Sequence, residues 1–387
     1  MVFVLRHRVE FIILVVTLAI QMVFGYWALQ TPGVGRSRFW RRVIVGVVAL
    51  LCAWLCAGVL LDAVRVTKLL PETWVSWVRG GAIVWALLSM GILPAWFLIR
   101  CLPKPKAISN PSRRHFMQLV RTALIGAPTA ALGYGVFVQR AQFSLREVDL
   151  RLPNLPKDLD GLRLVQVSDI HLSPFLSRKD LDRNVAMANE TRAHIALVTG
   201  DLITTRRDPV DACIERLAQL RSDAGTFGCL GNHEVYAGIE NYVTRQGARH
   251  GIRFLRREFE ALRFGGSTLR LTGVDYQKFG GPYLTGAQEF VDPAAFNILL
   301  SHNPDVFPVA VQQGYQLTIS GHTHGGQVDV EILRHDLSFA RFFTPYVYGE
   351  YRLGRGSVYV TRGIGTVGLP ARLGAPPEVA LIRLCAI

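Results

Sequence analysis

Four long apolar stretches occupy the first third of the chain. Residues 11–29, 43–61 and 81–99 carry no charge, and a fourth stretch, 120–138, is richer in Gly and Ala. Each of the first three is long enough to cross the ~30 Å hydrocarbon core of a membrane as a helix. The repetition of such lengths argues against ordinary buried core helices. The pattern predicts a membrane region of about four spans within residues 1–145.

The pattern changes after a short segment, 146–161, which we expect to be a linker. Residues 162–387 contain short apolar runs, each ending in a polar cluster, with helical periodicity between several of them. The runs lie at 162–171, 194–202, 225–234, 296–305 and 317–327, and the helical segments at 178–192, 209–222, 239–251 and 305–314. Short buried strands that alternate with helices predict a layered α/β domain.

Polar side chains follow every one of these predicted strands. They are Asp169, His171, Asp201, Asn232, His233, His302, His322 and His324. Ligands of such sheets bind beyond the carboxyl ends of the strands, so one pocket could collect all of these side chains. The last two histidines stand one residue apart in a glycine-rich turn, so their side chains are expected to point the same way.

Carboxylates, an amide oxygen and imidazoles, without a thiolate, suit Mn, Fe or Zn. The set is too large for one tetrahedral site, but it fits two metals that share a bridging carboxylate. Two such metals stabilise both ends of a displacement at phosphorus and generate a hydroxide near neutral pH. The sequence therefore predicts a two-metal centre that acts on phosphate esters.

The motifs resemble those of the calcineurin-like metallophosphoesterase family, from Leu162 to about Leu384. They are Asp169-Ile170-His171, Gly200-Asp201, Gly231-Asn232-His233-Glu234, His302 and Gly321-His322-Thr323-His324, in the order that the family has them. The resemblance implies a four-layer α/β/β/α sandwich with two divalent metal ions. The whole layout, with spans before the domain, is similar to the membrane-anchored branch of the family.

The resemblance also implies a role for each residue. It assigns Asp169, His171 and His324 to the first metal, Asn232, His302 and His322 to the second, and Asp201 to a bridge between them. His233 would be a general acid, or would stabilise charge on the phosphoryl oxygen, without binding metal. Near the C-terminus, Arg362 and Arg372 are candidate substrate contacts at the pocket rim, with plain turn geometry as the alternative.

The net charge of +14 falls largely in two loops of the membrane region. One loop holds Arg36, Arg38, Arg41 and Arg42, and the other holds Arg100, Lys104, Lys106, Arg113, Arg114 and Arg121. By the positive-inside rule both loops are cytoplasmic. Four spans across the cell (inner) membrane would then place both termini on its extracytoplasmic side. This placement makes the bilayer the expected partner of the basic residues, and nucleic acid is not expected.

Residues 112–117, Ser-Arg-Arg-His-Phe-Met, resemble a twin-arginine export signal, although a plain basic loop is the alternative. Both interpretations send the C-terminal half out of the cytoplasm. A disulfide between Cys213 and Cys229 would be permitted there, but their spacing does not require one.

These observations favour a membrane-anchored phosphoesterase whose substrate is a phosphodiester or pyrophosphate, lipid-linked or nucleotide-like. One alternative is hydrolysis of a UDP-2,3-diacylglucosamine-type pyrophosphate in lipid A precursor synthesis, but such a substrate is cytoplasmic. Another alternative is a non-catalytic membrane receptor or scaffold. The complete set of predicted metal ligands argues against it.

Overall fold

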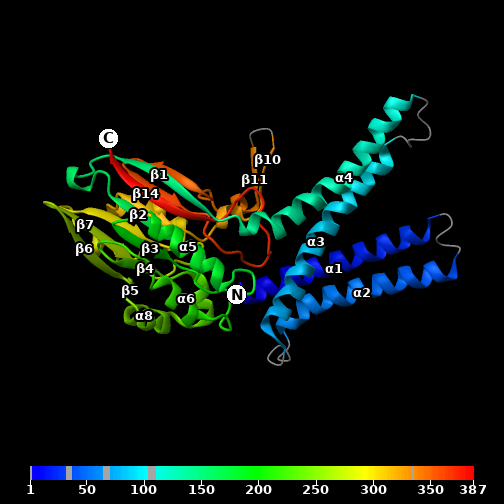
Figure 1. Ribbon diagram of the computed structural model, residues 1–387, viewed down its shortest axis with the longest axis horizontal. Coiled ribbons are helices and arrows are strands. Elements are labelled where there is room, and N and C mark those ends of the chain that lie inside the picture. The colour runs from blue at the N-terminus through cyan, green and yellow to red at the C-terminus, as the bar shows by residue number, and fades with distance from the viewer. Residues whose placement is uncertain (1, 32–36, 64–69, 103–109, 333–334) are drawn as a thin grey trace. The chain divides into compact units, whose positions relative to one another are not determined.

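The computed structural model describes residues 2–31, 37–63, 70–102, 110–332 and 335–387. The chain divides into two compact units, which Figure 1 shows in blue to cyan and in green to red. Residues 1–134 and 368–370 form the first unit, and residues 135–367 and 371–387 form the second.

The first unit is built from long helices. They are α1 (Val2–Leu29), α2 (Arg38–Ala63), α3 (Glu72–Cys101) and α4 (Pro111–Phe137). In the part of the chain that the structure describes, three helices are long and apolar enough to cross a membrane: Phe11–Leu29, Arg38–Val59 and Thr73–Cys101. The fourth predicted span is a helix, α4, but it is not among these three, because its residues are less apolar.

Small and apolar side chains pack α1, α2 and α3 together. Leu14, Leu55, Ala82 and Ala86 form their shared core, whereas apolar side chains such as Leu50 face outward and are exposed. This inverted distribution is the one that lipid surroundings require.

Aromatic and basic groups gather where α3 ends. The guanidinium of Arg100 lies 3.8 Å from the ring centre of Trp96, which stacks on Trp27. Arg121 of α4 donates hydrogen bonds to the carbonyl oxygens of Ile99 and Leu102 at 3.0 and 2.9 Å. Such groups are typical of a membrane–water interface, as expected from the basic loops. Three of the predicted loop cations, Arg36, Lys104 and Lys106, lie outside the described residues.

The second unit contains two six-stranded sheets. The first has the order β1-β14-β2-β3-β4-β5, and neighbouring strands are parallel except for β14 and β2. Its strands are β1 (Ser144–Leu152), β14 (Glu378–Ala386), β2 (Arg163–Val167), β3 (Ile195–Thr199), β4 (Thr226–Cys229) and β5 (Ile252–Phe254).

The second sheet has the order β12-β13-β9-β8-β7-β6, with antiparallel pairs at both edges and parallel pairs between. Its strands are β12 (Gly349–Leu353), β13 (Gly356–Val360), β9 (Leu317–Ser320), β8 (Phe296–Leu300), β7 (Ser267–Gly273) and β6 (Glu258–Phe264). A separate hairpin is formed by β10 (Asp329–Ile332) and β11 (His335–Ser338).

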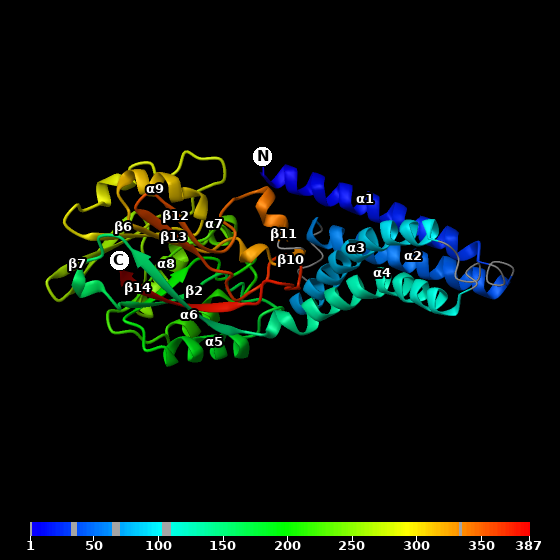
Figure 2. The ribbon, with the colours of Figure 1, turned by 90° about the horizontal axis from the view of Figure 1, so that it is seen from above.

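Helices cover the outer face of each sheet. Figure 2 shows α9 on one side of the sheets and α5 and α6 on the other. The covering helices are α5 (Arg178–Glu190), α6 (Val210–Leu217) and α8 (Glu240–Arg249) on the first sheet and α9 (Phe307–Gln313) on the second. The predicted four-layer α/β/β/α sandwich is therefore confirmed.

Alternation along the strands builds these layers. In β2, Leu164 packs between the sheets, whereas Val165 and Val167 pack under the helices. Neighbouring side chains of a strand point to opposite faces, so an apolar run such as this one is buried on both sides. The predicted strands and helices are all present, within the ranges given by the sequence pattern.

The segment expected to be a linker is instead part of the domain. Residues 144–152 form β1, which pairs in parallel with β14 along the edge of the first sheet. Only Leu150 and Leu152 of this strand are buried, because its outer positions are charged and exposed. The charged positions made an edge strand look like a linker, and the domain begins earlier than predicted.

Candidate metal centre

The loops that follow β2, β3, β4, β8 and β9 meet at one edge of the two sheets. They bring together all of the side chains predicted from the strand ends: Asp169, His171, Asp201, Asn232, His233, His302, His322 and His324. Most of these side chains are buried.

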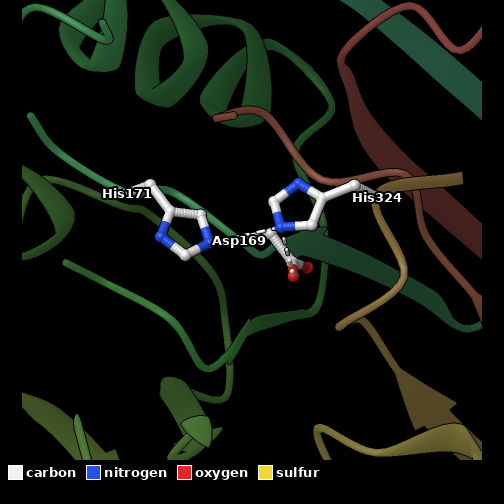
Figure 3. Close-up of side chains that lie close together, drawn as sticks. All are labelled: Asp169, His171 and His324. Atoms are coloured by element: carbon white, nitrogen blue, oxygen red, sulfur yellow. Dashed lines mark hydrogen bonds and ion pairs between the residues drawn. The ribbon is translucent and has the colours of Figure 1, made fainter. Parts of the chain in front are cut away.

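One group consists of Asp169, His171 and His324, whose ligand atoms lie within 4.8 Å of one another. Figure 3 shows the two imidazole rings beside the Asp169 carboxylate. Nε2 of His171 lies 3.2 Å from Nε2 of His324, and the latter lies 3.5 Å from Oδ1 of Asp169. Three ligand atoms are thus aimed at one point.

A second group consists of Asp201, His302 and His322, again within 4.8 Å. Oδ2 of Asp201 lies 3.1 Å from Nε2 of His302 and 3.5 Å from Nε2 of His171, which belongs to the first group. One carboxylate oxygen therefore lies between the two groups, where a bridging ligand would have to be.

One buried polar atom at this centre, Oδ1 of Asn232, lacks a hydrogen bond among the described residues. A buried polar atom without a partner is costly. A metal ion would satisfy this atom, and the oxygen and nitrogen donors of the centre suit Mn, Fe or Zn. The residues present therefore fit a pair of divalent ions.

The backbone is strained at these residues. Asp169, His171, Asp201, His322 and His324 all have positive φ, between 46° and 77°. Residues other than glycine rarely adopt this left-handed conformation, and such strain gathers at functional sites. It turns the side chains at the strand ends toward a common point.

Two glycines allow the loops to approach one another. A Cβ at Gly231 would lie 2.1 Å from Oδ1 of Asp201, and one at Gly321 would lie 2.3 Å from Oδ2 of Asp169. A side chain at either position would displace a carboxylate, so these motif glycines are needed for space.

Hydrogen bonds orient the imidazole rings from outside. Nδ1 of His302 lies 2.6 Å from the carbonyl oxygen of Thr199, and Nδ1 of His171 lies 3.1 Å from Oγ1 of Thr204. Donation from Nδ1 to a carbonyl leaves the Nε2 lone pair of His302 free to face the centre, as in many metal-binding histidines.

Burial, and then the neighbouring His233, lower the pKa of His171 to about 3. Burial and the neighbouring His302 lower the pKa of His322 to about 3 as well. A neutral imidazole is the form that binds metal. At His302 burial also acts downward, but the carboxylates of Asp201 and Asp169 prevail and raise its pKa to about 10. The carboxylates thus attract positive charge to the centre.

His233 differs from the other histidines in its contacts. Its backbone N–H donates to Oδ1 of Asp201 at 2.9 Å, and its Nδ1 lies 2.7 Å from the carbonyl oxygen of Thr204. Its ring lies edge-on to His171, with ring centres 4.7 Å apart. A ring nitrogen of His233 is also within 4.8 Å of the ligand atoms of His171 and Asp201.

Glu234 is a site residue whose role the sequence reasoning missed. Its buried carboxylate accepts hydrogen bonds from the backbone N–H groups of Gly231, Asp201 and Leu202 at 2.8, 3.0 and 2.7 Å. The sequence feature that could have indicated this role is its position in the first turn of α7 (Asn232–Ala237), where an acidic side chain can hydrogen-bond back to the helix N-terminus.

Arg372 does not occupy the position expected of a substrate contact. Its side chain is fully buried, and all five of its guanidinium N–H groups have acceptors. The acceptors are the carbonyl oxygens of Arg362, Gly363, Gly365, His324 and Ala375, and Nδ1 of His324 also lies 3.3 Å from Nη2. Arg372 therefore fastens the 362–365 loop to the turn that carries His324, and no N–H group is left for a substrate.

Arg362 is placed differently. Its guanidinium lies 3.6 Å from the ring centre of Tyr348, and Nη1 lies 3.9 Å from Oε2 of the buried Glu378. About a fifth of its side chain is exposed (19%). It remains a candidate for contact with a substrate.

The chain belongs to the calcineurin-like phosphoesterase family. A sequence profile of that family matches residues 162–326. An uncharacterized metallophosphoesterase, YkuE, of Bacillus subtilis is 30% identical over 285 residues, which cover 70% of this chain and 97% of that protein.

Two further relatives cover different shares of the chain. The Danio rerio protein named "Transmembrane protein with metallophosphoesterase domain" is 28% identical over 413 residues, which cover 98% of this chain and 90% of that protein. The Escherichia coli phosphodiesterase YaeI is 28% identical over 282 residues, covering 70% of this chain and 99% of that protein. The similarity to the first of these extends through the apolar helices.

Replacement of Arg372 tests its structural role. Arg372→Met leaves buried carbonyl groups without partners, so we expect the domain to lose about 2–5 kcal/mol of unfolding free energy. We expect Mn²⁺ affinity to fall about 10–100-fold, because the backbone of His324 is no longer held. Calorimetry with Mn²⁺ and hydrogen exchange of the domain measure both quantities in the full chain.

The control is Arg383→Met, which removes a half-exposed arginine of β14. It should change neither quantity appreciably. If Arg372→Met binds Mn²⁺ normally and only raises KM, Arg372 contacts the substrate and the structural role is wrong.

Proposed function

We propose that this protein is a membrane-anchored, metal-dependent phosphoesterase. The main support for this proposal is the position of Asp201, whose Oδ2 lies between two groups of buried nitrogen and oxygen atoms that could bind metal. Such a shared carboxylate is what two adjacent metal ions need, and two ions are suited to displacement at phosphorus.

Asp169, His171 and His324 would hold the first ion, and Asn232, His302 and His322 the second, with Asp201 as the bridge. The two groups of ligand atoms and the unpartnered Oδ1 of Asn232 support this assignment. When bound, the ions would polarise the phosphoryl oxygen and lower the pKa of water. The donor types are compatible with Mn, Fe or Zn.

His233 would act as the general acid toward the leaving group, or would stabilise charge on the phosphoryl oxygen. Its Nδ1 donates to the Thr204 carbonyl, which leaves Nε2 as the atom that can carry a proton to substrate. The hydrogen bond from its backbone to Asp201 keeps the ring beside the metal ligands.

The substrate would be a phosphodiester or pyrophosphate linked to a lipid. A membrane anchor raises the rate of encounter with other membrane components. The name of the Escherichia coli relative, a phosphodiesterase, supports the diester class. Arg362, held over Tyr348 and partly exposed, is the proposed contact for a second anionic group of the substrate.

The domain would lie outside the cytoplasm of the cell that carries it, on an inner membrane. The Arg-rich ends of α2, α3 and α4 favour the cytoplasm, and α4 would then return the chain across the membrane. The length of α4, 27 residues, is sufficient for such a crossing.

Asp201→Asn tests the two-metal chemistry. An amide cannot bridge two cations as a carboxylate does, so we expect hydrolysis of bis-p-nitrophenyl phosphate by the full chain to fall about 10³-fold. Asp149→Asn, at an exposed position of β1, is the matched control and should retain activity. Full Mn²⁺-dependent turnover by Asp201→Asn would exclude Asp201 as the bridge between two metal ions.

His233→Asn distinguishes an acid from a ligand. We expect kcat for an alkyl phosphodiester to fall about 10²–10⁴-fold, because its leaving group needs a proton. The loss should be smaller for a p-nitrophenyl ester, whose leaving group departs as an anion, and bound Mn²⁺ should be unchanged. Loss of metal from this variant would make His233 a ligand instead.

Labelling of single cysteines tests the topology. Cys101 lies at the end of α3, and Ile387, which is 78% exposed, lies at the end of the domain. In intact spheroplasts a membrane-impermeant maleimide should label Ile387→Cys, made in a variant whose other cysteines are replaced. A variant that retains only Cys101 should react after permeabilisation alone. Reaction of both cysteines only after permeabilisation would mean a cytoplasmic domain and a non-spanning α4.

A further inference from the structure

The end of α4 is joined to the domain through a short ladder of segments. The backbone N–H of Arg372 donates to the carbonyl oxygen of Gly135 at 3.1 Å, and that of Gly374 to Oε1 of Gln139 at 2.9 Å. On its other side, Leu373 accepts from the N–H of Asp329 at 2.7 Å. Residues 135–139, 372–374 and 327–329 therefore lie side by side.

This ladder reaches the metal centre directly. The guanidinium of Arg372 donates to the carbonyl oxygen of His324, while its backbone pairs with Gly135. One residue thus separates the last turn of α4 from a candidate metal ligand. Only six residues, 138–143, connect α4 to β1, and Arg140 among them donates to the carbonyl oxygen of Phe175.

Large apolar side chains are exposed on this part of the domain. The short helix η8 (Phe339–Phe342) packs against the turn η7 (His324–Gly326), which contains the ligand His324. Phe342 is 81% exposed and Phe343 is 57% exposed. At the end of α4, Phe137 is 75% exposed and Val138 is 43% exposed. We call Phe342 and Phe343 the aromatic tip.

The turn that carries the aromatic tip is held in place. Oγ1 of Thr344 donates to Oδ1 of Asp305 at 2.5 Å, and its backbone N–H donates to the carbonyl oxygen of Ala340 at 3.0 Å. Two phenylalanines are therefore presented to the surroundings by a fixed turn.

We propose that the aromatic tip enters the surface of the membrane that holds the apolar helices, so that the metal centre acts on phosphate groups at the lipid–water interface. Aromatic and apolar side chains bind this interface favourably. The bilayer is the partner we propose for the aromatic tip. The last residues of α4 belong to the same unit as the tip, and the six residues that connect α4 to β1 are hydrogen-bonded to the domain.

The inference rests on the proposed function for the substrate class, but not for the insertion. Phosphate esters of lipids have their reacting atoms at the depth of the head groups. The inserted tip would be adjacent to the turn that contains His324. The metal centre could therefore bind such esters without extracting the lipid from the bilayer. Esters dissolved in water would reach it without help from the tip.

Insertion can be measured without catalysis. The full chain would carry 4-fluorophenylalanine at position 342, in nanodiscs of phosphatidylcholine and phosphatidylglycerol, with a nitroxide on the acyl chain of some lipids. We expect the nitroxide to enhance ¹⁹F relaxation at 342 severalfold more than at 353. Leu353 is the matched site because it is an apolar residue that is 44% exposed. It is the last residue of β12, at the opposite end of the strand from Gly349 and the metal centre. Equal relaxation at the two sites would overturn the proposal.

A second measurement tests the consequence for catalysis. In the same nanodiscs, Phe342→Ser with Phe343→Ser should lower the hydrolysis of phosphatidyl-p-nitrophenol about tenfold relative to that of bis-p-nitrophenyl phosphate. Leu353→Ser should leave this ratio unchanged. An unchanged ratio in the double variant would overturn the interfacial role. Failure of wild-type protein to hydrolyse either ester would instead reject the proposed function, while relaxation still reports on insertion.

Discussion

The buried carboxylate of Glu234 binds the backbone of two loops at once, and the geometry of the metal centre depends on this interaction. It accepts hydrogen bonds from the backbone N–H groups of Gly231, in the loop after β4, and of Asp201 and Leu202, in the loop after β3. Charge-assisted bonds of this kind are stronger than those between neutral groups. They fix Asp201 against the start of α7, so the carboxylate proposed as the bridge, Asn232 and His233 keep one arrangement.

The fold must compensate for what this arrangement costs. Five candidate ligands have left-handed backbone conformations, and two carboxylates lie within a cluster of imidazoles. Each strained residue costs of order 1–3 kcal/mol, so the surroundings must determine it. The strands on which the loops stand are buried on both faces. The carbonyl oxygen of Thr199 accepts a hydrogen bond from His302, and Arg372 donates one to the backbone of His324, so the outer sides of these two residues are held. Rigid sheets thus carry strained ends, and divalent cations would offset the gathered negative charge.

The sequence was sufficient to predict the layers and the residues at the strand ends, because both follow from short-range patterns. Buried parallel strands read as apolar runs, and their carboxyl ends meet at one edge. It was insufficient for Glu234 and Arg372, whose roles depend on backbone groups distant in the chain. Strand β1 was missed because four of its nine residues are charged, at Arg146, Glu147, Asp149 and Arg151, and an edge strand needs only one apolar face.

The same long-range contacts connect anchoring to chemistry. The backbone of Arg372 pairs with Gly135 at the end of α4, and its side chain pairs with the His324 turn. A Cβ at Gly135 would lie 2.8 Å from the carbonyl oxygen of Arg372, so the helix end approaches this loop as closely as backbone permits. A flexible tether would need no such fit. The end of α4 and the His324 turn therefore share one set of contacts, made through Arg372.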